Sequence, residues 1–163
     1  MTVQPGAGAR GRRIAVTGAD GRLGRAVMAA SGPAALALTR RDFDLDQPDR
    51  FRALVHRIRP DIVVHCAAMT DVDACAREPE LALRRNGEAV AALAEACDGA
   101  GVKLVLISTN EVFDGERDDG RGYREDDRVS PRNPYGASKL AGERAAGAAF
   151  GGIAGLWIVR TSW

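Results

Sequence analysis

The stretch RIAVTGADGRLGRAV, residues 13–27, places three glycines directly after a short apolar run. Gly18, Gly21 and Gly24 are spaced G-x-x-G-x-x-G, and a helix-like pattern follows them. Between a strand and a helix, the first glycine permits the tight turn, the second lets a pyrophosphate approach the backbone, and the third lets the helix pack against the sheet. The N–H groups of the helix's first turn then face the phosphates. The stretch therefore predicts a dinucleotide-binding turn, with a glycine-rich turn that binds no ligand as the alternative.

Strand-like and helix-like segments alternate along the rest of the chain. The apolar runs expected to form strands are 13–17, 35–39, 61–66, 102–108 and 153–160. The segments expected to form helices are 22–30, 48–58, 81–100 and 134–149. Continuous apolar strands separated by helices are typical of a parallel sheet buried on both faces. The sequence predicts an α/β fold over residues 13–163, a Rossmann-type doubly wound parallel sheet flanked by helices, after a flexible tail over residues 1–12.

Composition and charge argue against several classes of protein. The 163 residues, 45% hydrophobic and 28% charged, suit one globular domain. A net charge of +1 gives no general attraction to nucleic acid or to anionic membranes. Neither a membrane span nor an apolar signal core is visible, so a cytoplasmic protein is expected. Cys66, Cys75 and Cys97 lack metal-binding or redox spacing and are interpreted as reduced, buried thiols.

The residues after the second expected strand bear on the choice of cofactor. An NAD-specific site usually has an acidic residue about 20 residues beyond the glycines, where it binds the ribose. Here Thr39 and Arg40 stand in that place. An arginine suits a 2′-phosphate, so NADPH is the preferred cofactor and NADH the alternative, although Arg40 could equally be a solvated surface charge. Asp44 and Leu45 follow at a place that could flank the adenine, and a capping role is the other interpretation of Asp44.

Tyr135 and Lys139 form the strongest candidate for acid–base chemistry. Asn133 and Pro134 have the composition of a helix start, which puts Tyr135 and Lys139 one turn apart on one face. A nearby ammonium favours the tyrosinate, so we expect Lys139 to lower the pKa of Tyr135 and make it a proton donor to a carbonyl. Lys139 is one of only two lysines in a chain with 23 Lys and Arg residues, which suggests a chemical need for lysine at position 139.

Two hydroxyls end the fourth expected strand, in VLISTNEVFDG. Carboxyl ends of parallel strands line the ligand crevice, so Ser108 or Thr109 could bind a substrate carbonyl and the tyrosine. Thr109 is the preferred candidate, and a bond from its hydroxyl to nearby backbone is the alternative. The two histidines, His56 and His65, are interpreted as structural, and no metal site is predicted.

The chain resembles the extended short-chain dehydrogenase/reductase family, and within it the family of dTDP-4-dehydrorhamnose reductases. The resemblance covers residues 13–163 and is carried by TGADGRLG, DFDLDQP, RPDIVVHCAAMTDVDACAREPELALRRN, STNEVFDG and NPYGASKLAGE. It implies that Gly21, Arg22 and Leu23 contact the pyrophosphate. It also implies that Ala67, Ala68 and Met69 line the cofactor, and that Thr109, Tyr135 and Lys139 form the catalytic set. Asn86 matches a family asparagine that is expected to hold nearby backbone.

Two departures from the family pattern affect what the resemblance implies. Asn110 and Glu111 replace an Asp-Tyr pair on the substrate side, which leaves the sugar open. The sequence also stops at WIVRTSW, where the family continues into a smaller C-terminal domain. We therefore expect the cofactor-binding and catalytic half of a longer protein, poorly stable and inactive as an isolated fragment. Asn110 is kept with Thr109 as a substrate-contacting candidate.

The expected function is NADPH-dependent reduction of a dTDP-4-keto-6-deoxysugar, a sugar nucleotide. One alternative is a sugar-nucleotide epimerase or dehydratase, which would usually carry the ribose-binding acid that is missing here. Another is a non-catalytic regulatory subunit similar to that of methionine adenosyltransferase, which the Asn110-Glu111 replacement keeps open. The resemblance leaves the use of Mg²⁺ and the formation of a homodimer undecided.

Overall fold

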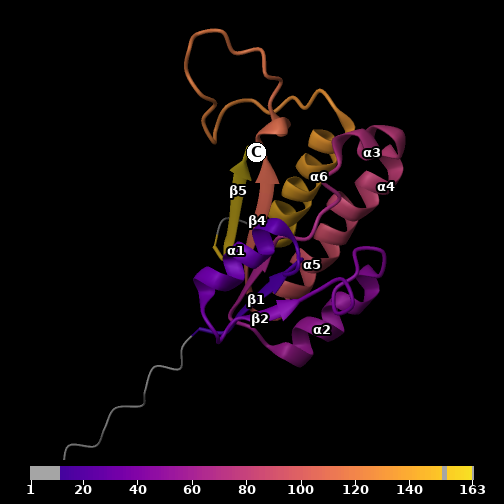
Figure 1. The fold of residues 1–163 in the computed structure, drawn as a ribbon, viewed down its shortest axis with the longest axis vertical. Coiled ribbons are helices and arrows are strands. Elements are labelled where there is room, and N and C mark those ends of the chain that lie inside the picture. Colours follow the sequence, from indigo (N-terminus) through magenta and orange to yellow (C-terminus); the bar gives the residue numbers. More distant parts are fainter. Residues whose placement is uncertain (1–11, 152–153, 163) are drawn as a thin grey trace, which may run out of the picture.

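The central feature of the fold is a five-stranded parallel sheet, seen in a computed structural model that describes residues 12–151 and 154–162 (Figure 1). The strand order is β2-β1-β3-β4-β5, and every neighbouring pair is parallel. The strands are β1 (Ile14–Thr17), β2 (Leu36–Leu38), β3 (Ile62–His65), β4 (Lys103–Thr109) and β5 (Leu156–Thr161). The predicted α/β class and parallel sheet are confirmed. The predicted tail over 1–12 lies outside the described residues except for Arg12, as does residue 153 of the last predicted strand.

Helices cover both faces of the sheet. They are α1 (Arg22–Ser31), α2 (Phe51–Ile58), α3 (Val72–Arg77), α4 (Pro79–Leu83), α5 (Ala89–Asp98) and α6 (Pro134–Ala149). The connection from β1 to β2 runs in one direction along the sheet, and the connections from β2 to β3, β3 to β4 and β4 to β5 run in the opposite direction. Because such crossovers are right-handed, α1 lies on one face of the sheet and α2, α5 and α6 lie on the other. On that second face, α5 packs against both α2 and α6.

The helix predicted over 81–100 is wrong in its extent. The structure has α4 ending at Leu83, then a π-helical turn, η2 (Arg84–Glu88), and only then α5. A π-helical turn widens the helix by one residue and is frequent at functional sites. Here it places Asn86, which is 1% exposed, toward the segment after β3 and toward α6. The helix predicted over 48–58 is also modified, because its first three residues form a 3₁₀ turn.

The core lies between the sheet and the three helices on one face. Strand residues that share a register row, such as Val63 with Leu104, point into it together. Phe51 of α2 and Leu93 of α5 close it from the helix side, and both are 1% exposed. Cys75 and Cys97 are buried and Cys66 half-buried, all as free thiols. None of the described helices is both long and apolar enough to cross a membrane.

His65 is a structural histidine, in agreement with its interpretation from sequence. Its Nδ1 lies 2.8 Å from the Thr17 hydroxyl on the neighbouring strand, and its ring meets Phe43 edge-on. Burial lowers the pKa of His65 to about 3, so the imidazole is neutral at physiological pH.

The segment between β4 and α6 is mostly irregular. After a 3₁₀ turn, η3 (Asn110–Val112), residues 113–133 contain neither helix nor strand and extend beyond the carboxyl ends of β4 and β5 (Figure 1). Phe113 stacks on Tyr123 within the segment. Arg160 of β5 forms a bidentate ion pair with Glu143 of α6 at 3.0 and 2.7 Å and donates to the carbonyl of Glu125. The loop is therefore anchored to the sheet and to α6.

Helix α6 approaches the π-helical turn at backbone contact. A Cβ built on Gly142 would lie 2.3 Å from the carbonyl oxygen of Asn86, whereas one built on Gly147 of the same helix would meet no described atom within 4 Å. Only glycine therefore permits the observed spacing at position 142.

Matched alanine substitutions test this contact. Gly142→Ala should lower the free energy of unfolding by about 1–3 kcal/mol because the helices must separate. Gly147→Ala should raise it by about 0.5–1 kcal/mol through helix propensity alone. Urea unfolding followed by circular dichroism measures both, and equal effects of the two substitutions would contradict the packing described here.

Candidate functional site

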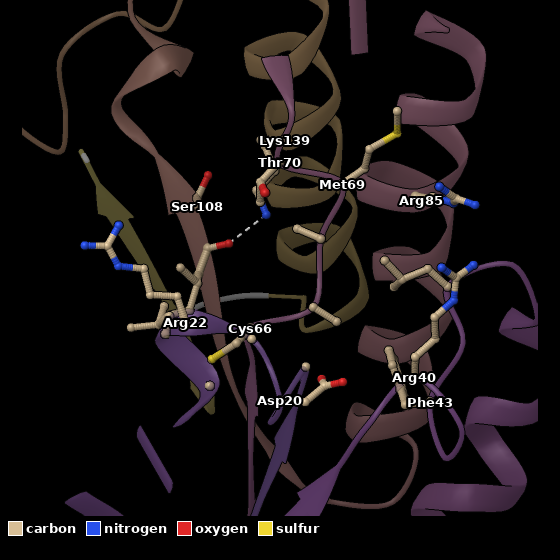
Figure 2. Close-up of a pocket in the computed structure, with 18 of the residues that line it drawn as sticks. Asp20, Arg22, Arg40, Phe43, Cys66, Met69, Thr70, Arg85, Ser108 and Lys139 are labelled. Carbon is tan, nitrogen blue, oxygen red and sulfur yellow. Dashed lines mark hydrogen bonds between the residues drawn. The ribbon is translucent and has the colours of Figure 1, made fainter. Parts of the chain in front are cut away.

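A cavity of about 490 Å³ lies at the carboxyl ends of the strands, between the turn after β1 and the start of α6 (Figure 2). Most of the residues predicted to bind cofactor line it. They are Gly18, Gly21, Arg22, Leu23, Gly24, Arg40, Asp44, Leu45, Ala67, Ala68, Met69, Tyr135 and Lys139. Segments far apart in sequence thus converge on one concavity, as expected for the ligand crevice of a doubly wound sheet.

The glycine turn forms one wall of the cavity. Gly18 has φ of 62°, and a Cβ there would lie 2.8 Å from the backbone nitrogen of Ala67. A Cβ on Gly24 would lie 2.0 Å from the Gly18 carbonyl oxygen, so α1 can start this close to β1 only with glycine at both positions. The N–H groups of the first turn of α1 have no acceptor within the helix and lie beside the cavity.

Asn86 holds the opposite wall in place. Its amide oxygen accepts a hydrogen bond from the Met69 N–H, and its amide nitrogen donates to the Met69 carbonyl, both at 2.9 Å. The same nitrogen donates to the Ser138 hydroxyl at 3.0 Å, and Ser138 donates to the Tyr135 carbonyl at 2.7 Å. One buried side chain therefore fixes the segment after β3 and the first turn of α6, as the resemblance implied.

Helix α6 begins as predicted and carries Tyr135 into the site. The Asn133 side chain caps the helix by accepting from the Gly136 N–H at 2.7 Å, and Pro134 occupies the first turn. Tyr135 is 6% exposed and packs against Met69 and Cys75. Burial raises the pKa of Tyr135, and a hydrogen bond with Thr109 opposes that rise.

Lys139 lies one turn further along α6 with its ammonium inside the protein. The residue is 4% exposed, and its Nζ donates to the carbonyl oxygen of Ile107 at 2.8 Å (Figure 2). Burial lowers the pKa of Lys139 to about 8, although the Glu143 carboxylate favours the charged form.

The expected effect of Lys139 on Tyr135 is not found. The pKa of Tyr135 is raised rather than lowered, because burial dominates and because the Lys139 ammonium bonds to Ile107 instead of the phenol. A raised pKa keeps Tyr135 protonated at neutral pH, which is the form a proton donor needs. The Thr109 hydrogen bond then favours the tyrosinate that donation would leave.

At the end of the cavity near β2, charged side chains form a small network. The guanidinium of Arg85, from η2, donates to both carboxylate oxygens of Asp46 at 2.7 and 2.6 Å. Arg40 lies 3.4 Å from the same carboxylate and 3.8 Å from that of Asp44. The Arg85 hydrogen bonds lower the pKa of Asp46, so this network stays ionised.

Three predicted residues lie outside the cavity lining. Thr39 bonds Asp42 through its hydroxyl at 3.0 Å and borders a neighbouring hollow with Arg41 and Arg50. Thr109 is 1% exposed, and its hydroxyl accepts from the Glu111 N–H at 3.1 Å as the cap of η3. Asn110 is exposed on η3.

The cavity also contains residues that the sequence did not single out for it. They are Asp20, Phe43, Cys66, Thr70, Arg85, Ile107 and Ser108. Ser108 was considered at the strand end, but Thr109 was preferred. Arg85 gave no signal because arginine is common in this chain and the π-helical turn that directs it was not visible. Within the described residues, no group of three or more His, Cys, Asp or Glu side chains could hold a metal ion.

Known proteins with this fold are similar to the chain in sequence as well as in architecture. A dTDP-4-dehydrorhamnose reductase from Streptomyces griseus is 43% identical over 154 residues, which cover 93% of this chain and 49% of that protein. The crystal structure of a dTDP-4-dehydrorhamnose reductase from Bacillus anthracis in complex with NADP is 36% identical with a TM-score of 0.89, covering 96% of this chain and 55% of that one.

A more distant likeness extends to an epimerase. The UDP-glucose 4-epimerase of Thermus thermophilus, solved in complex with NAD, is 28% identical with a TM-score of 0.76, over 91% of this chain and 54% of that one. The chain spans about half the length of the curated relatives it matches. The model of the family described as the RmlD substrate binding domain matches residues 12–163. The fold, the glycine turn and this match together show that the chain belongs to the RmlD substrate binding domain family.

Proposed function

We propose that this chain is the NADPH-binding and catalytic part of a reductase that acts on a dTDP-4-keto-6-deoxysugar. The observation that carries the proposal is the single cavity in which the glycine turn faces Tyr135 and Lys139. The names of the relatives, and the NADP bound to the Bacillus anthracis reductase, support the same reading. The dinucleotide-binding turn, the catalytic set and the sugar nucleotide as substrate remain parts of this proposal.

The two ends of the cavity suit the two halves of a dinucleotide. Arg40 and Arg85 line one end, where they pair with Asp44 and Asp46, and a 2′-phosphate would compete with these carboxylates for the guanidinium groups. Thr39 and Arg40, rather than an acidic residue, follow β2 at the position of a ribose-binding acid. The first turn of α1 supplies free N–H groups for the pyrophosphate in the middle. Tyr135, Lys139 and Ser108 lie at the other end. These features favour NADPH over NADH.

The catalytic roles follow from the protonation states of the side chains. NADPH, when bound, supplies the hydride that reduces a keto carbon. The Tyr135 hydroxyl donates its proton to the carbonyl oxygen, and its raised pKa keeps that proton in place until then. Thr109, hydrogen-bonded to Tyr135, stabilises the resulting tyrosinate. The Lys139 ammonium lies beside the Ile107 carbonyl, within the cavity, where it can bind ribose hydroxyls.

A matched pair of tyrosine variants tests the proton donor. In the full-length protein, Tyr135→Phe should lower turnover of a dTDP-4-keto-6-deoxysugar by about 10²–10⁴-fold, because the general acid is removed. Tyr123→Phe removes the other phenol, which bonds Asp114 in the loop, and should leave turnover within a few-fold. NADPH oxidation followed by absorbance measures both. Absence of turnover in the wild-type protein would favour the non-catalytic, regulatory alternative, and full activity of Tyr135→Phe would refute the assigned acid.

The pH profile tests the role of Lys139. Its ammonium is the dominant form below its pKa of about 8 and is lost above it. We therefore expect kcat/KM for NADPH to be level below pH 8 or so and to fall about tenfold per pH unit above it. Lys139→Arg keeps the charge at every pH and should lose the descending limb, at a lower maximum. A wild-type profile that stays level through about pH 10 would contradict the role given to this ammonium.

A further inference from the structure

Ser108 carries a buried hydroxyl that bonds to nothing in the described part of the chain. It is the penultimate residue of β4 and is 3% exposed, and its Oγ has no hydrogen-bond partner among the described residues. A buried hydroxyl left unpaired is unfavourable, and native structures hold few of them. The Ser108 side chain lines the cavity, so a bound ligand can supply the missing partner.

The two carbonyls beside the Ser108 side chain each have a donor within the fold, whereas the hydroxyl has no partner among the described residues. The preceding carbonyl, of Ile107, accepts from the Lys139 ammonium at 2.8 Å. The Ser108 carbonyl accepts from the Thr161 hydroxyl on β5 at 3.4 Å. The other unpaired buried polar atom among the described residues, Nε2 of His65, belongs to a residue that does not line the cavity.

The two adjacent hydroxyls at the end of β4 have different surroundings. Thr109 caps η3 and does not line the cavity. Ser108 lines the cavity, and its hydroxyl makes no hydrogen bond to the described residues. Figure 2 shows Ser108 and Lys139 at one end of the cavity, with Arg40 and Arg85 across from them. The Ser108 hydroxyl therefore faces whichever half of a dinucleotide lies away from the 2′-phosphate.

We propose that the Ser108 hydroxyl binds the ribose hydroxyls of the nicotinamide half of the cofactor, together with the Lys139 ammonium and the Ile107 carbonyl. The inference rests on the function proposed above. The three groups offer a donor, an acceptor and a hydroxyl that can be either. A vicinal diol both donates and accepts, and it matches this set. A phosphate only accepts, so its oxygens would be repelled by the Ile107 carbonyl oxygen.

Binding of two probes to Ser108→Ala tests the proposal. NADPH contains the nicotinamide ribose, and 2′,5′-ADP contains only the adenine half with its 2′-phosphate. Calorimetric titration of the full-length protein should show the Kd of NADPH raised by about three- to tenfold, the loss of one hydrogen bond, with the Kd of 2′,5′-ADP unchanged. The control Ser31→Ala, at the end of α1 and outside the cavity, should change neither Kd.

Thermal unfolding of the free protein separates a ligand contact from a structural role. Removing an unpaired buried hydroxyl should leave Tm unchanged or raise it. A lowered Tm with equal weakening of both probes would overturn the proposal, and so would an unchanged Kd for NADPH. Wild-type protein that bound neither probe would refute the proposed cofactor itself, an outcome distinct from loss of the Ser108 effect alone.

Discussion

The site depends on one buried amide, that of Asn86, which joins three separate parts of the chain. It pairs with both backbone groups of Met69 after β3 and with Ser138 on α6, and Ser138 in turn bonds the Tyr135 carbonyl. Such an arrangement is strong only when every member is satisfied, as it is here. The π-helical turn that presents Asn86 also brings the Asn86 carbonyl against Gly142. These contacts fix the position of α6 relative to the sheet.

That position determines the electrostatics of the part of the cavity that Tyr135 and Lys139 line. With α6 so close to the sheet, Tyr135 and Lys139 are both desolvated, and burial favours the neutral form of each side chain. It therefore raises the pKa of the Tyr135 phenol and lowers the pKa of the Lys139 ammonium. The site thus holds a protonated tyrosine beside a lysine whose charge changes near pH 8. This differs from a tyrosine acidified by its lysine, and it assigns stabilisation of the tyrosinate to Thr109 instead.

Local patterns predicted much of the fold and most of the cavity lining. Asn133 and Pro134 identified the start of α6, and the glycine spacing identified the turn after β1, because these features depend only on neighbouring residues. The π-helical turn, the Arg85–Asp46 pair and the separate tasks of Ser108 and Thr109 depend on contacts between residues distant in sequence. A strand pattern places both hydroxyls at the crevice, and only the turn of the chain at η3 shows which one enters it.

The most direct test of the account is a crystal structure of the protein with NADPH bound. We predict the pyrophosphate on the first turn of α1, the 2′-phosphate within hydrogen-bond distance of Arg40, and the nicotinamide beside Tyr135 and Lys139. A dinucleotide bound in the reverse direction, or in another hollow of the surface, would contradict the claim that this cavity unites cofactor binding with the acid that completes the reduction.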